Sequence, residues 1–86
     1  MYIEIITPDE KFFEGEVESA TFPGIDGSFQ VLNNHAPLIS TLGKGDIRFI
    51  RLVEKKPEET HVLVEGGIVE VLNNRVSVLA EKIFSE

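Results

Sequence analysis

The chain has 86 residues, of which 42% are hydrophobic and 27% charged, and its formal net charge is −7. This length predicts one compact domain, and no apolar run approaches the roughly 20 residues of a membrane-spanning helix. The negative charge disfavours binding to nucleic acid or anionic lipid, and the absence of cysteine excludes disulfides and thiolate sites. The opening sequence MYIEIITPDEKFF matches neither a secretory nor a transit signal, so we expect no export.

Short apolar segments rich in Val, Ile and Phe recur along the chain, with Gly, Pro, Asn or Asp between them. This spacing predicts an all-β sandwich or barrel. No amphipathic helix is visible, and only residues 81–86 are compatible with the start of one. The expected strands, in chain order, are residues 2–6, 12–22, 28–32, 37–42, 46–53, 61–65, 68–72 and 75–80.

Several short sequences between these segments predict turns. Pro23-Gly24 fits a type II turn, and Asp26-Gly27 offers a second tight turn just after it. The polar interval EKKPEET at 54–60 predicts an exposed hairpin tip. Gly66-Gly67 permits a sharp bend, and Asn73-Asn74 predicts a hairpin because asparagine accepts left-handed backbone geometry.

Three glutamates, Glu14, Glu16 and Glu18, recur every two residues and are therefore expected on one face of a strand. Carboxylates gathered in this way can do acid-base chemistry when their environments push their pKa values apart. Three like charges at this spacing are more typical of an exposed edge strand guarded against aggregation. We favour the edge interpretation over the catalytic one.

The two histidines, His35 and His61, are too few and too far apart to predict a zinc site in a chain without cysteine. His35 lies in the stretch that is richest in turn residues. Two readings of it remain open: its ring holds loop backbone in place, or it contacts a partner.

Neither the glycines nor the serines form a recognisable catalytic or phosphate-binding motif. No G-x-x-x-x-G-K-[ST] or G-x-G-x-x-G sequence precedes a helix, and no serine lies in a G-x-S-x-G elbow. We therefore predict no catalytic centre and no cofactor. The residue inventory fits a small rigid binding module.

Two rival classes of function stay open at this point. One is a β-barrel for single-stranded nucleic acid in which Phe22, Phe29 and Phe49 would stack on bases, although the net charge of −7 opposes it. The other is a small hydrolase that uses Glu16 and Glu18.

Five sequence motifs in order carry a resemblance to a known family: F-x-G-x-V at 13–17, PGIDGSFQVLNNHAPLIS at 23–40, L-x-x-G-x-I at 42–47, VEGGIVEV at 64–71 and VSVLAE at 76–81. Together they resemble the ε subunit of F-type ATP synthase over essentially the whole chain. The resemblance implies that residues 1–86 form the amino-terminal domain of that subunit, a single β-sandwich or flattened barrel of about ten strands.

The resemblance also implies a function. In the family this domain is a non-catalytic rotor part of the proton- or sodium-translocating enzyme, which links the γ subunit to the c-ring and so couples ion flow to ATP synthesis. It implies a peripheral position on the cytoplasmic face of the bacterial inner membrane, without direct membrane insertion and without nucleic acid.

By position, the resemblance implies two contact sets. The family's ring-facing loop falls on 27–34, and many relatives carry an acidic residue where this chain has Ser28, so an ion pair to the ring is not carried over to that position. The implied c-ring contacts are Gly27, Ser28, Phe29, Asn33 and Asn34. The implied γ contacts are Thr7, His35, Leu38 and Ser40.

Family members usually continue into a two-helix carboxy-terminal domain, which in many bacteria inhibits ATP hydrolysis and can bind ATP. We expect that domain to be absent from these 86 residues. Two readings stay open: a natural short form without those functions, or a piece of a longer protein that carries them.

Overall fold

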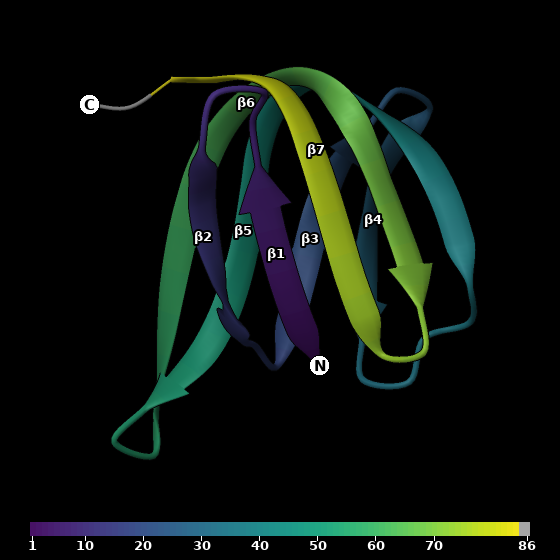
Figure 1. Cartoon of the computed structure of the whole chain (residues 1–86). Helices are drawn as coiled ribbons and strands as arrows, with labels where there is room; N and C mark the ends of the chain where they lie inside the picture. Colours follow the sequence, from purple (N-terminus) through teal and green to yellow (C-terminus); the bar gives the residue numbers. More distant parts are fainter. Residues whose placement is uncertain (85–86) are drawn as a thin grey trace.

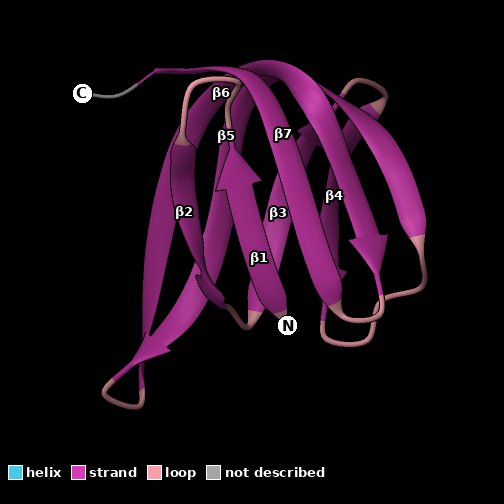
Figure 2. Cartoon of the chain, in the orientation of Figure 1, coloured by secondary structure: helices cyan, strands magenta, loops and turns pink. Residues whose placement is uncertain are grey.

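The computed structural model describes residues 1–84, and these consist only of strands, turns and short connections (Figure 2). The predicted all-β fold is confirmed. The 81–86 segment does not begin a helix, because residues 81–84 continue the last strand; residues 85 and 86 lie outside the described part. The seven strands are β1 (Tyr2–Ile6), β2 (Lys11–Glu16), β3 (Ser19–Gly24), β4 (Gly27–Leu32), β5 (Leu38–Val53), β6 (Lys56–Leu72) and β7 (Arg75–Phe84).

The strands form one sheet in the order β2-β1-β7-β6-β5-β3-β4. β1 and β7 run parallel, and the other neighbours run antiparallel. β5 and β6 are long enough to arch over the top of the molecule, so the sheet folds into two layers (Figure 1). The front layer in that view holds β1, β7 and the end of β6, and the back layer holds β3 and β4.

The structure has seven strands, against about ten implied by the resemblance and eight expected from the pattern, and two pairs of the eight expected strands are each one continuous strand. Segments 37–42 and 46–53 lie in β5, and segments 61–65 and 68–72 lie in β6. The ladder between β5 and β6 keeps one register from end to end. The glycines between these segments therefore bend the strands without ending them.

The bend is marked by a change in which positions are buried. In β6 the buried residues are Val62 and Val64 before the bend and Gly67, Val69 and Val71 after it. The alternation thus shifts by one residue, which exchanges the two faces of the strand. In the sequence, such a broken alternation is typical of two separate strands.

Gly67 is required at this bend. Its φ is +143°, and a Cβ there would lie 2.4 Å from the Leu79 carbonyl oxygen of the adjacent strand. Opposite it, β5 changes phase in the same place, between buried Leu42 and buried Ile47. Only glycine combines this φ with so close an approach of two backbones.

The opposite error occurs at 12–22, which we expected to be one strand. The chain leaves β2 at Glu16 and enters β3 at Ser19, because β2 pairs with β1 whereas β3 pairs with β5. At the crossing Val17 is buried, and the Glu18 amide donates to the Ile50 carbonyl at 2.6 Å. The apolar positions change phase here, from Phe13 and Val17 to Ala20 and Phe22, but no Gly, Pro, Asn or Asp lies at residues 17–18 to mark the end of a strand.

The turn predictions have a mixed outcome. Asn73-Asn74 does form a hairpin turn, with φ of 51° and 60°. The hairpin predicted at 54–60 exists, but its turn is only Glu54-Lys55 and the remainder belongs to β6. The type II turn at Pro23-Gly24 is wrong, since both residues end β3 and the chain reverses at 25–26.

The space between the two layers is filled by aliphatic side chains and two phenylalanines. Phe22 and Phe49 are the largest fully buried side chains. Each contacts a partly buried ring at the margin: Phe49 lies 4.6 Å from Phe13 and Phe22 lies 5.6 Å from Phe29, measured between ring centroids. The core of this small domain therefore uses four of its seven aromatic residues.

Candidate functional site

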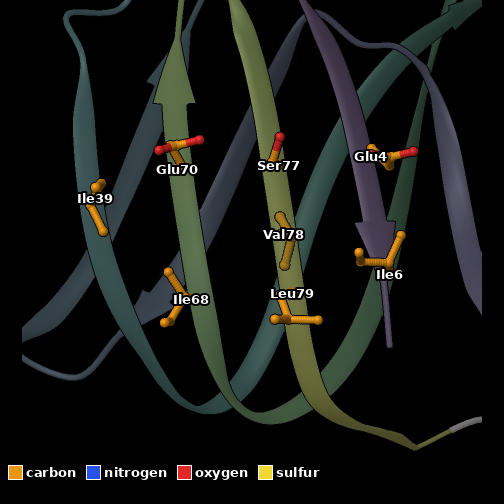
Figure 3. A pocket seen from close by; sticks show the side chains of 8 residues that line it. All are labelled: Glu4, Ile6, Ile39, Ile68, Glu70, Ser77, Val78 and Leu79. Carbon is orange, nitrogen blue, oxygen red and sulfur yellow. The ribbon is translucent and has the colours of Figure 1, made fainter. Parts of the chain in front are cut away.

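The outward side of the front layer carries apolar side chains that nothing in the chain covers. Ile39 of β5, Ile68 of β6 and Leu79 of β7 are 72%, 50% and 47% exposed. Ile6 of β1 is half-buried and continues the row, because Ile68 pairs with Leu79 and Leu79 pairs with Ile6 (Figure 3). We call Ile6, Ile39, Ile68 and Leu79 the apolar face. Contiguous exposed apolar surface of this kind marks interaction sites.

The apolar face is hollowed by a cavity of about 240 Å³. Besides the four apolar residues, the cavity is lined by Glu4, Glu70, Ser77 and the buried Val78. Glu70, Ser77 and Glu4 lie side by side on β6, β7 and β1 (Figure 3). The hollow has an aliphatic side and a carboxylate-bearing side.

A second, shallower hollow of about 380 Å³ adjoins the first. It is lined by Pro37, Leu38, Ile39, Glu70, Val71 and Leu72. Ile39 and Glu70 belong to both hollows, so the uncovered surface extends from β1 to the β4–β5 connection.

Beside the apolar face, charged side chains of β1 and β2 pair with one another. The Lys11 ammonium lies 2.8 Å from the Glu14 carboxylate and 3.3 Å from that of Glu4, and the Tyr2 hydroxyl donates to Glu14. The hydrogen bond from Lys11, with that from Tyr2, lowers the pKa of Glu14 below its ordinary value. The same contacts with Glu14 raise the pKa values of Lys11 and Tyr2.

These contacts favour the edge-strand interpretation of Glu14, Glu16 and Glu18 over the catalytic one. β2 is an edge strand of the sheet, as the edge interpretation predicted. Glu14 is bound to Lys11 and Tyr2, Glu16 lies 3.2 Å from the Met1 nitrogen, and Glu18 is exposed at the crossing to β3. The lowered pKa of Glu14 does not suit a general acid, and the contacts of all three glutamates fit an exposed edge.

The aromatic rings on which the nucleic-acid alternative depends are not available to stack on bases. Phe22 and Phe49 are 0% and 1% exposed, so neither ring can stack on a base, and Phe29 packs against the core. Within residues 1–84 no group of three or more His, Cys, Asp or Glu side chains is arranged to hold a metal. The same residues contain no helical segment with the length and hydropathy of a membrane span.

The structure places two of the predicted γ contacts at the rim of the apolar face. Thr7 follows Ile6 directly, and its hydroxyl accepts from the Asp9 and Glu10 amides at 3.3 and 3.2 Å. His35 lies beyond the other end of the face, in the connection between β4 and β5, and its Nδ1 is 2.7 Å from the Ala36 carbonyl. Both side chains hold their own turns.

The other two predicted γ contacts point inward. Leu38 packs against the core, and Ser40 lies two residues further along the same side of β5. Ile39 and Thr41, on the opposite side of the strand, take the exposed positions. Leu38 and Ser40 are both partly exposed, and Leu38 also lines the second hollow, so their contact with γ stays a prediction.

The predicted ring contacts divide into two groups. The strand expected at 28–32 is confirmed as β4 (Gly27–Leu32), so most of the ring-facing stretch implied at 27–34 is a strand, and Phe29 on it packs against Phe22. A six-residue strand is about 20 Å long, which separates Ser28 at one end from Asn33 and Asn34 beyond the other. The predicted ring contacts therefore lie at two separate ends of β4.

Asn33 and Asn34 have structural contacts at their end of β4. The Asn33 side-chain oxygen is 2.6 Å from the Met1 nitrogen, and the Asn34 amide donates to the Asn74 side chain at 2.7 Å. Asn34 has a φ of 63°, which asparagine tolerates. Asn33 thus ties the end of β4 to the amino terminus, and Asn34 ties it to the β6–β7 turn.

Sequence reasoning missed the exposed apolar residues. Ile25, 67% exposed, lies at the β3–β4 turn together with Gly27 and Ser28. For the apolar face a signal was present in IVEVL at 68–72, where Ile68 alternates with core valines on a strand that is apolar on both sides. A domain of this size cannot cover both sides of such a strand by itself.

The fold is similar to chains in solved structures of rotary enzymes. A chain of the central stalk and c-ring of Tetrahymena thermophila mitochondrial ATP synthase aligns with a TM-score of 0.83 at 18% identity, covering 98% of this chain and 65% of that one. A chain of the Euglena gracilis mitochondrial ATP synthase, in its OSCP/F1/c-ring structure, aligns at 0.82 with 19% identity, covering 95% and 51%. At these identities the likeness establishes the fold.

Sequence relatives are more similar. The ATP synthase epsilon chain of Maridesulfovibrio salexigens is 43% identical over 82 residues, which are 94% of this chain and 54% of the relative. That of Chlorobium limicola is 41% identical over 81 residues, 94% of this chain and 89% of the relative. The chain thus spans about half of the first relative and most of the second. The family model for the β-sandwich domain of the ATP synthase delta/epsilon chain matches residues 1–86, and the chain therefore belongs to that family.

Proposed function

We propose that this chain is a non-catalytic subunit of the central stalk of a proton- or sodium-translocating F-type ATP synthase. In this role it links the γ subunit to the c-ring and couples ion flow to ATP synthesis. Relatives named as ATP synthase epsilon chains support the proposal, and so does the likeness of the fold to central-stalk chains. The structural observation that carries it is the apolar face.

The apolar face is the proposed γ-binding surface. Its exposed residues come from adjacent strands of one rigid sheet, so they need little reorganisation on binding. Thr7 and His35 lie at its two ends and are proposed as rim contacts. Leu38 and Ser40 support it from the inner side of β5, where Leu38 packs on the core.

The β3–β4 turn is the proposed c-ring contact. It presents Ile25 with Gly27 and Ser28 at the outer end of an edge hairpin. Of the other predicted ring contacts, Phe29 supports the hairpin from the core side. Asn33 and Asn34 are at the far end of β4 and are proposed to brace the fold there.

The proposal places the chain on the cytoplasmic face of the bacterial inner membrane as a peripheral subunit, without direct membrane insertion. Relatives from bacteria support this location. Two protein partners also account for the tight turns at 25–26 and 33–34, because rigid turns lose less entropy on binding.

Size-exclusion chromatography with the matching γ subunit tests the γ claim. The unaltered chain is expected to co-elute with γ, and Ile68→Glu is expected to elute separately because it places a charge in the buried interface. Leu52→Glu is the matched control: Leu52 is 55% exposed against 50% for Ile68, but lies near the β5–β6 tip. Separate elution of the unaltered chain and γ would overturn the proposed function.

The ring contact can be tested by cross-linking, because the chain has no cysteine of its own. In the assembled enzyme Ser28→Cys is expected to cross-link to the c-ring. Glu54→Cys, at the tip of the β5–β6 hairpin, is the control and is expected not to. Equal yields from both positions would refute the assignment of the β3–β4 turn.

A further inference from the structure

Glu70 lies within the apolar face without a counter-charge. It pairs across the strands with Ile39 on one side and Ser77 on the other. Among residues 1–84 its carboxylate takes part in no ion pair and no side-chain hydrogen bond, whereas Glu4 on the same row is bound by Lys11. Glu70 is thus an uncompensated charge inside the surface proposed to be covered.

The shape of the hollow follows from Ser77. This small side chain lies between Glu70 and Glu4, so the larger neighbours leave a cavity of about 240 Å³ above it. Figure 3 shows the two carboxylates and the serine hydroxyl in one row, and Ile68, Leu79 and Ile6 in the next. The cavity therefore has an aliphatic wall along its length and acceptors at one edge.

An apolar partner surface pressed onto this hollow would strip water from Glu70. Burying a carboxylate without a counter-charge is strongly unfavourable, so a stable complex requires a cation at this place. Lysine and arginine combine a long aliphatic stem with a cationic head, and such side chains lay the stem on apolar surface while the head meets a charge. The hollow offers both environments in that arrangement.

The Ser77 hydroxyl beside the Glu70 carboxylate favours arginine over lysine. Glu70 and Glu4 are two strands apart, which puts their backbones about 10 Å apart, with the Ser77 hydroxyl between them. A planar guanidinium with five N–H donors can bond Glu70 and Ser77 together, whereas an ammonium is a compact point charge.

We infer that this hollow is a pocket for one basic side chain of the γ subunit, an arginine or a lysine, with its stem against Ile68 and Leu79 and its charged head at Glu70 and Ser77. The inference rests on the proposed function, since it names the chemistry by which γ is recognised at the apolar face. It also explains why a carboxylate is placed among exposed aliphatic residues.

The first test is titration calorimetry of the chain with the γ subunit. Glu70→Gln keeps the shape of the side chain and is expected to weaken binding about 10- to 100-fold, the loss of a charge-assisted hydrogen bond. It is also expected to reduce the salt dependence of the affinity. Glu54→Gln, which removes the same charge at the β5–β6 tip, is expected to bind as the unaltered chain does. Circular dichroism and melting temperature check that each variant is folded.

A charge reversal identifies the partner residue. Glu70→Lys is expected to abolish binding, and one γ variant with a basic residue replaced by glutamate is expected to restore it. If Glu70→Gln binds as tightly as the unaltered chain while Ile68→Glu does not bind, the pocket is refuted and the proposed function stands. If the unaltered chain does not bind γ, both are refuted.

Discussion

The outward sides of the two layers differ in whether their charged side chains have neighbours of opposite charge. On the back layer, Lys44 lies 4.0 Å from Glu65, and the His61 ring lies within 3.7 Å of Asp46 and 2.9 Å of Glu59. On the front layer the apolar face holds Glu70 with no counter-charge among the described residues.

This difference is informative because exposed ion pairs stabilise a fold very little. The Lys44–Glu65 pair is therefore of small value to stability, and the His61 contacts are ion pairs only when the ring is protonated. The front layer instead combines exposed aliphatic residues with the unpaired Glu70, and we propose that a partner brings the apolar area and the positive charge that this surface lacks.

The largest expected effect comes from the bend that creates the two layers. Gly67→Ala is expected to destabilise the fold by about 3 kcal/mol or more, because its φ of +143° and the 2.4 Å approach to Leu79 both oppose a side chain. Urea unfolding followed by circular dichroism measures this loss. Gly43→Ala in the facing strand is the control, since a Cβ there meets nothing closer than 3.9 Å. Similar losses at both positions would show that the bend does not depend on Gly67.

A smaller effect distinguishes the two sides of one strand. Val69 is fully buried and Ile68 is 50% exposed, although they are adjacent in β6. Val69→Ala is expected to cost about 2 kcal/mol of unfolding free energy, the value of a buried valine, and Ile68→Ala less than about 0.5 kcal/mol. In γ binding the order reverses, and Ile68→Ala is expected to have the larger effect. Equal stability losses would mean that the apolar face contributes to folding instead of to binding.

The smallest effect concerns the compensated charges beside the apolar face. The pKa of Glu14 is lowered from 4.5 by Lys11 and Tyr2, so their contacts stabilise the fold above that pH and are lost as the pH falls through the lowered value. Glu14→Gln is expected to lower stability slightly at neutral pH, and the difference from the unaltered chain should vanish in acid. NMR titration of the Glu14 carboxyl checks the cause, because Lys11→Gln should move its pKa back up. An unmoved titration in Lys11→Gln would contradict the assignment.

Much of the fold could be predicted from local pattern. Alternation every two residues in segments such as 68–72 is sufficient for an all-β assignment, and Asn73-Asn74 specified a hairpin because so few residues accept positive φ. Strand number could not be predicted in this way. The phase change at Gly67 resembles a strand end in sequence, and the crossing at Val17 resembles a continuous strand.

The candidate site was predicted only in part, for a related reason. The motif resemblance identified the stretch from Pro23 to Ser40, and Thr7 and His35 do flank one surface. Leu38, which it assigned to the γ interface, packs on the core and also lines the second hollow. Which side of β5 faces outward depends on how the sheet folds, and that is not a local property.

By itself, then, the amino-acid sequence determined the β class, the family and the absence of a catalytic motif, because these depend on residue types and on neighbours along the chain. The tertiary structure alone decided that Ile6, Ile39, Ile68 and Leu79 form one face and that Glu70 lies within it uncompensated. The physical reason is that cross-strand neighbours are set by sheet order and register. Here β1, β5, β6 and β7 come together from both ends of the chain.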